Sequence, residues 1–271
     1  MKKLLALVLA CAMTIGLLGC GKTQPTVNDE AANATERTTF TVGFDAEFPP
    51  YGYMDDNGEY VGFDLSLAEE VCKRNGWELK KQPIDRDAKD MELSSGAIDC
   101  IWKGFTMDGR ENDYTWTVPY VDNSQVFVTA VDSGIATKAD LAGKVVAVQA
   151  DSSALAALDD DADLTATFAN LTQFADYNTA FMDLEAGAVD VVAMDIGVAN
   201  YQISQRDAGK FVILDDYLSS EQYGVGFLLG NDALRDQVQA TLFEMVNDGS
   251  FESIADEWGL SDVICIKNYM N

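Results

Sequence analysis

A strand–helix–strand alternation occurs twice along the chain, and it restricts the fold more than any other feature of the sequence. In its first occurrence, β-favouring residues at 39–44, 78–81 and 97–102 are separated by an amphipathic stretch and then by a shorter helical one. Asp64 is placed to cap the amphipathic helix, and the Asn75-Gly76 pair to end it. The pattern predicts a mostly parallel sheet with helices on both faces.

The alternation begins again near Lys144. Its elements are strands at 144–148, 189–194 and 211–214, with helices at about 154–158, at about 178–186 and directly after Asp195. A strand at 223–229 and two amphipathic helices at 234–246 and 251–258 follow. Two α/β units of similar style, with a strand returning near Tyr223, predict two lobes around a cleft.

Polar side chains follow the ends of three predicted strands. Arg110 comes after 97–102, Ser153 after 144–148 and Asp195 after 189–194. Ligands of open α/β sheets bind beyond the carboxyl ends of the strands, so we expect these three residues to converge.

The chemistry of the three residues is complementary. The planar fork of an arginine matches a carboxylate, and a helix starting at Ser152 or Ser153 presents free N–H groups to an anion, although simple helix capping is the alternative role. Asp195 could cap the helix that follows it or hold a cation. A site that holds both an α-carboxylate and an α-ammonium group recognises an amino acid.

The N-terminus predicts export and lipid attachment. Lys2 and Lys3 precede an apolar run from Leu4 to Leu18, shorter than the roughly 20 residues of a membrane span. Residues 1–19 are therefore predicted to be a signal peptide, and Cys20 to become the lipidated N-terminus. Ordinary cleavage nearby, with Cys20 lost, is the alternative. Residues 20–38 are polar and lack periodicity, which predicts a flexible tether.

Charge and cysteine content disfavour several classes of function. The chain has 45 Asp and Glu against 18 Lys and Arg, and this net charge of −27 makes nucleic acid or an anionic membrane surface a poor partner. With no histidine and no paired-cysteine motif, no metal, cofactor or histidine-based mechanism is expected. Cys72, Cys100 and Cys265 allow at most one disulfide, and burial as apolar side chains is their expected state.

Short motifs in a fixed order then identify a resemblance, over about residues 41–258, to the solute-binding lipoproteins of polar-amino-acid ABC transporters. That family, family 3, has the type II periplasmic-binding-protein fold. The motifs are Val42-Gly43-Phe44-Asp45 with Phe48, Pro50 and Tyr51; Val61-Gly62-Phe63-Asp64-Leu65; Gly96-Ala97-Ile98-Asp99; Gly104-Phe105-Thr106 with Arg110; Pro119-Tyr120; the stretch 141–149; Gly187-Ala188-Val189-Asp190; and Tyr223-Gly224-Val225-Gly226-Phe227.

The resemblance implies an α/β fold of two lobes, each a mixed, mostly parallel sheet flanked by helices, joined by hinge strands at 124–131 and 223–229. Lobe 1 would comprise residues 39–126 and be completed by 223–271, and lobe 2 would comprise 127–222. Closure of the lobes on an amino acid would let the protein dock on a membrane permease.

The family's binding residues carry over by position. Arg110, with Thr106 and Ser153, would hold the α-carboxylate. Asp195 and the carbonyl of Gly104 would hold the α-ammonium. Phe48 would lie against the ligand side chain, and Asp45 would approach its polar end.

Three departures from the family pattern affect this site. Met107-Asp108-Gly109 replaces a longer stretch with a second threonine and a proline, which removes a hydroxyl contact, and Asp151 stands where a glycine is usual. Arg86 stands where many members have an aromatic residue, and Lys103 is nearby in the expected fold. Arg86 and Lys103 would suit an acidic ligand. Alternatively, Arg86 pairs with Asp45 or Glu47 and the pocket is electrically balanced.

The sequence therefore predicts an extracytoplasmic, lipid-anchored, monomeric binding protein that delivers an amino acid to an ABC permease and is not an enzyme. Two alternatives remain: an enzyme of the same fold that resembles cyclohexadienyl dehydratase, and a ligand sensor.

Overall fold

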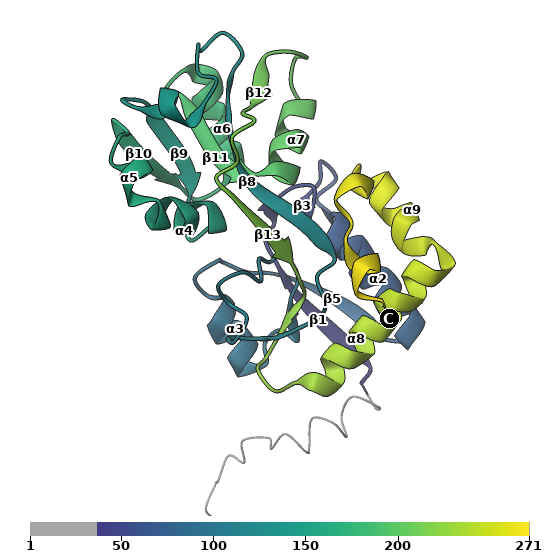
Figure 1. Ribbon diagram of the computed structural model, residues 1–271. Coiled ribbons are helices and arrows are strands. Elements are labelled where there is room, and N and C mark those ends of the chain that lie inside the picture. The colour runs from purple at the N-terminus through teal and green to yellow at the C-terminus, as the bar shows by residue number, and fades with distance from the viewer. Residues whose placement is uncertain (1–36, 271) are drawn as a thin grey trace, which may run out of the picture.

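The structure is a computed structural model that describes residues 37–270, and it has two lobes (Figure 1). The predicted signal peptide, Cys20 and nearly all of the predicted tether lie outside these residues. No helix between residues 37 and 270 is both long and apolar enough to cross a membrane.

The sheet of lobe 1 has the strand order β5-β1-β6-β14-β7. Its strands are β1 (Thr39–Phe44), β5 (Glu78–Pro83), β6 (Cys100–Ile101), β7 (Thr115–Trp116) and β14 (Gly226–Phe227). The first three are parallel, as the alternation predicted, whereas β14 is antiparallel to both of its neighbours. Of the strand predicted at 97–102, only Cys100–Ile101 is observed as a strand. A small second sheet contains β2 (Glu47–Phe48), β3 (Gly52–Met54) and β4 (Tyr60–Val61).

Two helices of lobe 1 lie between these strands, α2 (Phe63–Asn75) and α3 (Lys89–Ser95). Helix α2 ends at Gly76, which is left-handed with φ 71°, as predicted. The prediction that Asp64 caps α2 is wrong, because Gly62 is the capping residue and no side chain caps the helix. The buried carboxylate of Asp64 instead accepts hydrogen bonds from the Gly104 N–H (2.6 Å) and the Tyr120 hydroxyl (2.7 Å).

The sheet of lobe 2 has the order β10-β9-β11-β8-β12, and β13 also pairs with β8. Its strands are β8 (Val121–Ala130), β9 (Val145–Gln149), β10 (Asn170–Phe174), β11 (Val191–Asp195), β12 (Phe211–Ile213) and β13 (Ser219–Tyr223). Its helices are α4 (Ser153–Asp160), α5 (Ala162–Thr165), α6 (Tyr177–Ala186) and α7 (Ile196–Ser204), with a 3-10 turn η1 (Lys138–Leu141). The predicted strands and helices of the second alternation are confirmed, whereas β10 was not predicted. The sheet is mixed rather than mostly parallel, because β8 is antiparallel to β11, β12 and β13.

Strands β8 and β13 run between the lobes (Figure 1) and pair antiparallel from Ser219 opposite Gln125 to Tyr223 opposite Val121. The second hinge strand was predicted at 223–229, and this range is wrong. The pairing with β8 ends at Tyr223, and the chain then enters lobe 1 as β14. The predicted lobe boundaries at 126/127 and 222/223 fall inside β8 and β13 and stay predictions.

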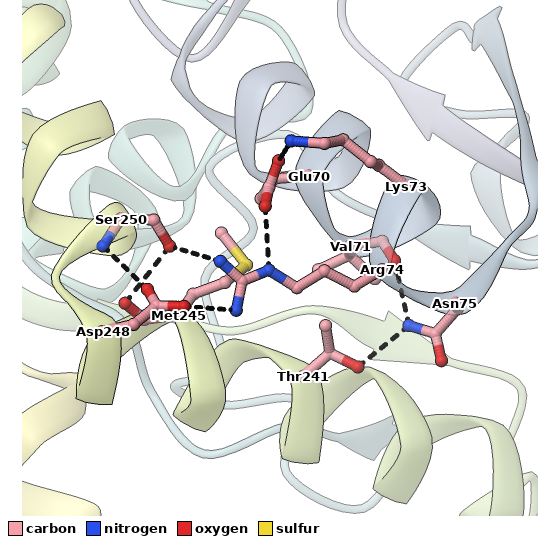
Figure 2. Close-up of polar contacts among 9 residues, drawn as sticks. All are labelled: Glu70, Val71, Lys73, Arg74, Asn75, Thr241, Met245, Asp248 and Ser250. Atoms are coloured by element: carbon pink, nitrogen blue, oxygen red, sulfur yellow. Dashed lines mark hydrogen bonds and ion pairs between the residues drawn. The ribbon is translucent and has the colours of Figure 1, made fainter.

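The C-terminal helices α8 (Asp232–Asp248) and α9 (Ser250–Glu257) lie against α2 in lobe 1 (Figure 1) and are followed by 3-10 turns η2 (Ser261–Val263) and η3 (Ile266–Tyr269). Arg74 of α2 contacts both helices (Figure 2): it donates to the Ser250 hydroxyl (2.8 Å), and its Nη1 lies 2.8 Å from an oxygen of Asp248. Asn75 donates to the Thr241 hydroxyl at 2.9 Å. These contacts attach the C-terminal helices to α2.

Buried side chains form one large core that runs from the sheet of lobe 1 into lobe 2, and two smaller cores lie beside it. Tyr51 of lobe 1 packs directly against Gly197 of α7 in lobe 2. A Cβ added to Gly197 would lie only 2.4 Å from the Tyr51 hydroxyl, so the contact leaves no room for a side chain. Cys72, Cys100 and Cys265 are buried and unpaired, as expected of apolar cysteines.

Candidate ligand-binding site

The predicted binding residues gather where the carboxyl ends of the lobe 1 strands face the amino ends of the lobe 2 helices. We call this region the interlobe site. It comprises the nine predicted residues Asp45, Phe48, Arg86, Lys103, Gly104, Thr106, Arg110, Ser153 and Asp195, together with Asn123, Gln125, Glu221 and Tyr223.

Thr106 is the central residue of the interlobe site. Its hydroxyl accepts a hydrogen bond from Ser153 of lobe 2 (2.8 Å) and donates one to Oε1 of Glu221 in β13 (2.9 Å). Ser153 is available for this contact because the neighbouring Ser152 caps α4, accepting from the Leu155 N–H at 3.1 Å. Ser152 therefore has the capping role, and the hydroxyl of Ser153 faces Thr106 instead.

Arg110 also contacts Thr106, at the backbone carbonyl and not at the hydroxyl. One of its Nη groups donates to the Thr106 carbonyl at 3.1 Å, and its guanidinium carbon lies 5.5 Å from the centre of the Phe105 ring. The side chain is half-buried and forms no ion pair with any residue between 37 and 270. Most of its five donors therefore remain available for an anion.

Two carboxylates share their hydrogen-bond donors, Glu221 on the hinge strand β13 and Asp195 at the end of β11. Oδ1 of Asp195 and Oε1 of Glu221 both accept from the amides of Asn123 and Gln125, at 2.7–2.9 Å, and the Tyr223 hydroxyl also donates to Asp195. In the described part of the chain, the other oxygen of each carboxylate accepts no hydrogen bond. Burial, followed by the nearby charge of Asp195, raises the pKa of Glu221 to about 7. Asp195 is the capping residue of α7, but its side chain does not bond the helix.

Asn123, Gln125 and Glu221 were missed from the sequence. Their signal is alternation: Asn123 and Gln125 share one face of β8, and Glu221 and Tyr223 share one face of β13. The predicted strands began at residues 124 and 223, so two of the three positions were left outside them.

Gly104 brings the backbone against this cluster. Its φ is 60°, and a Cβ there would lie 2.9 Å from the Phe48 ring and 3.1 Å from the Tyr223 ring. The Asp64 carboxylate holds its N–H, and burial raises the pKa of Asp64 to about 7 against the effect of its hydrogen bonds. Any other residue at this position would have a strained backbone, and its side chain would collide with the rings of Phe48 and Tyr223.

The remaining predicted residues form a second, charged cluster. Arg86 Nη2 lies 2.8 Å from Asp45 Oδ2, and the Arg86 guanidinium carbon lies 4.9 Å from the centre of the Phe48 ring. The predicted alternative, in which Arg86 pairs with Asp45, is therefore observed. Burial raises the pKa of Asp45, but the opposing charges of Arg86 and Lys103 outweigh it and hold this pKa below its usual value.

Asp151 precedes the helix that carries Ser153, and it alone among the described non-glycine residues has a positive φ, 52°. Glycine adopts this left-handed conformation without strain, which explains why the family pattern has glycine at this position. Its side chain is exposed and accepts no hydrogen bond from the described residues, so it does not crowd the interlobe site.

Known proteins share both the sequence and the fold. The L-cystine-binding protein TcyJ of Escherichia coli strain K12 is 26% identical over 231 residues, which cover 84% of this chain and 85% of that protein. A histidine-bound substrate-binding protein of an ABC uptake transporter from Streptococcus pneumoniae is 32% identical, with a TM-score of 0.83, over 88% of this chain and 99% of the other. The ancestral amino acid-binding protein AncCDT-1, described as a precursor of cyclohexadienyl dehydratase, is 25% identical with a TM-score of 0.76, over 84% of this chain and 98% of the other.

A family model described as bacterial extracellular solute-binding proteins, family 3, matches residues 40–261. This match includes all but the first residue of the three sheets, both hinge strands and every residue of the interlobe site. The chain therefore belongs to the bacterial extracellular solute-binding proteins of family 3.

Proposed function

We propose that this protein captures an α-amino acid in the interlobe site and delivers it to an ABC permease. The observation that carries the proposal is the position of Thr106, which contacts Arg110 on one side and Glu221, next to Asp195, on the other. The carboxylate and ammonium of an amino acid are separated by one carbon atom. A cation and an anion on either side of one residue match that head group.

In the proposed complex, Arg110 binds the α-carboxylate, helped by the hydroxyls of Thr106 and Ser153. The free oxygens of Asp195 and Glu221 accept from the α-ammonium, and the Gly104 carbonyl adds a further acceptor. Phe48 covers the ligand side chain. Cystine- and histidine-binding relatives support this class of ligand.

Thermal unfolding of the full chain, purified in a mild detergent and freed of ligand by unfolding and refolding, tests this function. The panel is the twenty amino acids with cystine, ornithine and small dicarboxylates. A ligand at a hundredfold excess over its Kd adds about 2.7 kcal/mol of stability, so one or a few compounds should raise the midpoint clearly. Arg110→Ala should abolish the shift, because removing one partner of a desolvated charge pair costs about 2–5 kcal/mol.

The matched control is Arg235→Ala, which removes an arginine that pairs with Asp232 and Asp236 in α8. That variant should retain the shift. If no amino acid raises the midpoint of the unmodified protein, the proposed function is wrong.

The protein works outside the cytoplasm in this proposal, as a monomer anchored by two or more acyl chains on Cys20. A single chain gives only marginal membrane binding, whereas two give a stable anchor. Cys20→Ser should move the protein from the detergent phase to the aqueous phase in a phase-separation assay and end incorporation of labelled fatty acid. Cys72→Ser, which changes a buried thiol, is the control. Membrane retention of the Cys20 variant would contradict the anchor.

An enzyme of the same fold is the second candidate, and Glu221 is the observation that favours it. A carboxyl group with a pKa of about 7 can exchange protons at neutral pH, as a dehydratase acid or base must. Likeness to a precursor of cyclohexadienyl dehydratase adds support. Turnover of prephenate or arogenate that Glu221→Gln abolishes would establish this activity, and saturable binding without turnover would exclude it.

A further inference from the structure

The charged cluster at the far end of the interlobe site has more positive than negative charge. Asp45, Arg86 and Lys103 follow β1, β5 and β6, and these strands are adjacent and parallel, with Phe44 opposite Pro83 and Gly43 opposite Ile101. Their carboxyl ends therefore bring the three side chains to one edge of the sheet. One carboxylate faces two cations there.

Asp45 is already engaged. Its Oδ2 faces Arg86 at 2.8 Å, and its Oδ1 accepts from the Glu47 N–H at 3.0 Å. Glu47 does not supply a second negative charge to this cluster, because it is exposed and accepts from Asn178 of lobe 2 at 3.0 Å. The single carboxylate cannot neutralise a second cation as well.

Arg86 has unused donors even within its ion pair. Nη2 faces Asp45 at 2.8 Å, whereas Nε is buried without an acceptor among residues 37–270. The side chain is 16% exposed, so little water reaches these groups. Buried donors of this kind are costly unless a ligand accepts from them.

Lys103 is the second cation, and it is 4% exposed. Its ammonium forms no hydrogen bond or ion pair with any described residue and lies 5.8 Å from the centre of the Phe105 ring. Burial and then the charge of Arg86 lower its pKa well below the usual value, while Asp45 opposes them, and Lys89 and Arg110 add smaller repulsions. Lysine is seldom buried unless it is paired.

We propose that Lys103, with Arg86, selects amino acids whose side chain ends in a carboxylate. The proposal rests on the proposed function and names the ligand class. A carboxylate beside Lys103 would neutralise the second cation and accept from the free donors of Arg86. Aspartate and glutamate have such a group, and so does cystine at its far end.

Calorimetric titration of the full chain tests the proposal with L-glutamate, L-aspartate, L-cystine, L-glutamine and L-arginine. At least one of the first three should bind about tenfold or more tightly than glutamine, which has the shape of glutamate without its charge. A glutamate or aspartate preference identifies a simple dicarboxylic ligand, and a cystine preference identifies a second amino-acid head group.

Lys103→Met should weaken the preferred acidic ligand about tenfold or more and change glutamine binding by less than about threefold. Lys80 is exposed on β5, and Lys80→Met makes the same change of charge. This control variant should change neither the affinity for the acidic ligand nor that for glutamine. Lys103→Gln serves as a second variant if methionine disturbs folding. Without ligand, Lys103→Met should raise the unfolding midpoint, because a buried amino group without a hydrogen-bond partner among the described residues is replaced by an apolar side chain.

Preferential binding of arginine or glutamine would overturn this selectivity and leave the proposed function standing. Equal loss of glutamate affinity in Lys80→Met and Lys103→Met would also overturn it, since a general charge effect would then be responsible. Absence of binding to every amino acid would instead reject the proposed function itself.

Discussion

A single backbone angle at Asp151 offers a test of local strain beside the interlobe site. Left-handed φ costs residues other than glycine about 1 kcal/mol or more, and Asp151 has a φ of 52°. Asp151→Gly removes the carboxylate and relieves the backbone strain. Asp151→Ala removes the same carboxylate but leaves the backbone strain in place. We therefore expect the glycine variant to exceed the alanine variant by about 1 kcal/mol in free energy of unfolding, measured with urea. Equal stability of the two variants would show that the backbone at this residue is relaxed.

Glu221 should make the ligand-free protein less stable as the pH rises. Its pKa in the folded protein is raised to about 7, so the folded state holds a proton that the unfolded state has already released near its ordinary pKa of 4.5. By linkage, this contribution is complete below pH 4.5 and is lost as the pH rises through 7. Asp64, whose pKa is also raised to about 7, acts in the same direction.

The free energy of unfolding should therefore fall between pH 5 and pH 8, and Glu221→Gln should fall less steeply. Urea unfolding at several pH values measures both slopes. Glu244→Gln, which removes an exposed carboxylate of α8, should keep the slope of the unmodified protein. Parallel curves for Glu221→Gln and the unmodified protein would mean that Glu221 titrates normally.

At the scale of elements, the attachment of α8 and α9 to α2 depends on Arg74. This side chain bonds Glu70 on its own helix (2.9 Å) and reaches Asp248 and Ser250 in the C-terminal segment (Figure 2). Arg74→Met should lower the free energy of unfolding by about 1–2 kcal/mol, a moderate value because the charges are partly exposed. Lys73→Met is the control, since Lys73 is 76% exposed and pairs with Glu70 alone. Similar losses in the two variants would contradict a specific role for Arg74.

Most elements could be predicted because their signals are local. The end of α2 at Gly76 and the end of α6 at Gly187 both follow from left-handed glycines after an amphipathic run. Asp64 was assigned as a cap because that role is common near helix starts. Its actual partners, Gly104 and Tyr120, are 40 and 56 residues away, and no local pattern reveals them.

The second hinge strand was also misplaced because its pairing partner is distant in the sequence. The run Gly224-Val225-Gly226-Phe227 is apolar and resembles a strand, and part of it is one, but in the sheet of lobe 1. The pairing with β8 uses Ser219–Tyr223, which is polar because its carboxylate and hydroxyl face the interlobe site. Strand bounds depend on the partner strand, which the sequence does not specify.

At the scale of the whole molecule, the site could be predicted in its parts but not in its pairings. Arg110, Ser153 and Asp195 were inferred from their place after strands, and the two-lobed fold is the one that was expected. The sequence did not reveal that Asn123 and Gln125 would each donate to both Asp195 and Glu221, because those bonds connect residues 70 to 98 positions apart. Nor did it indicate that Lys103 would be buried without a partner.

A crystal structure of the protein with the amino acid that most raises its unfolding midpoint would test the central claim most directly. The account predicts that the α-carboxylate lies within hydrogen-bonding distance of the Arg110 guanidinium, and the α-ammonium within that distance of Asp195. An amino acid bound elsewhere would contradict it. One such place is the pocket of about 330 Å³ that Pro50, Tyr201 and Trp258 help to line.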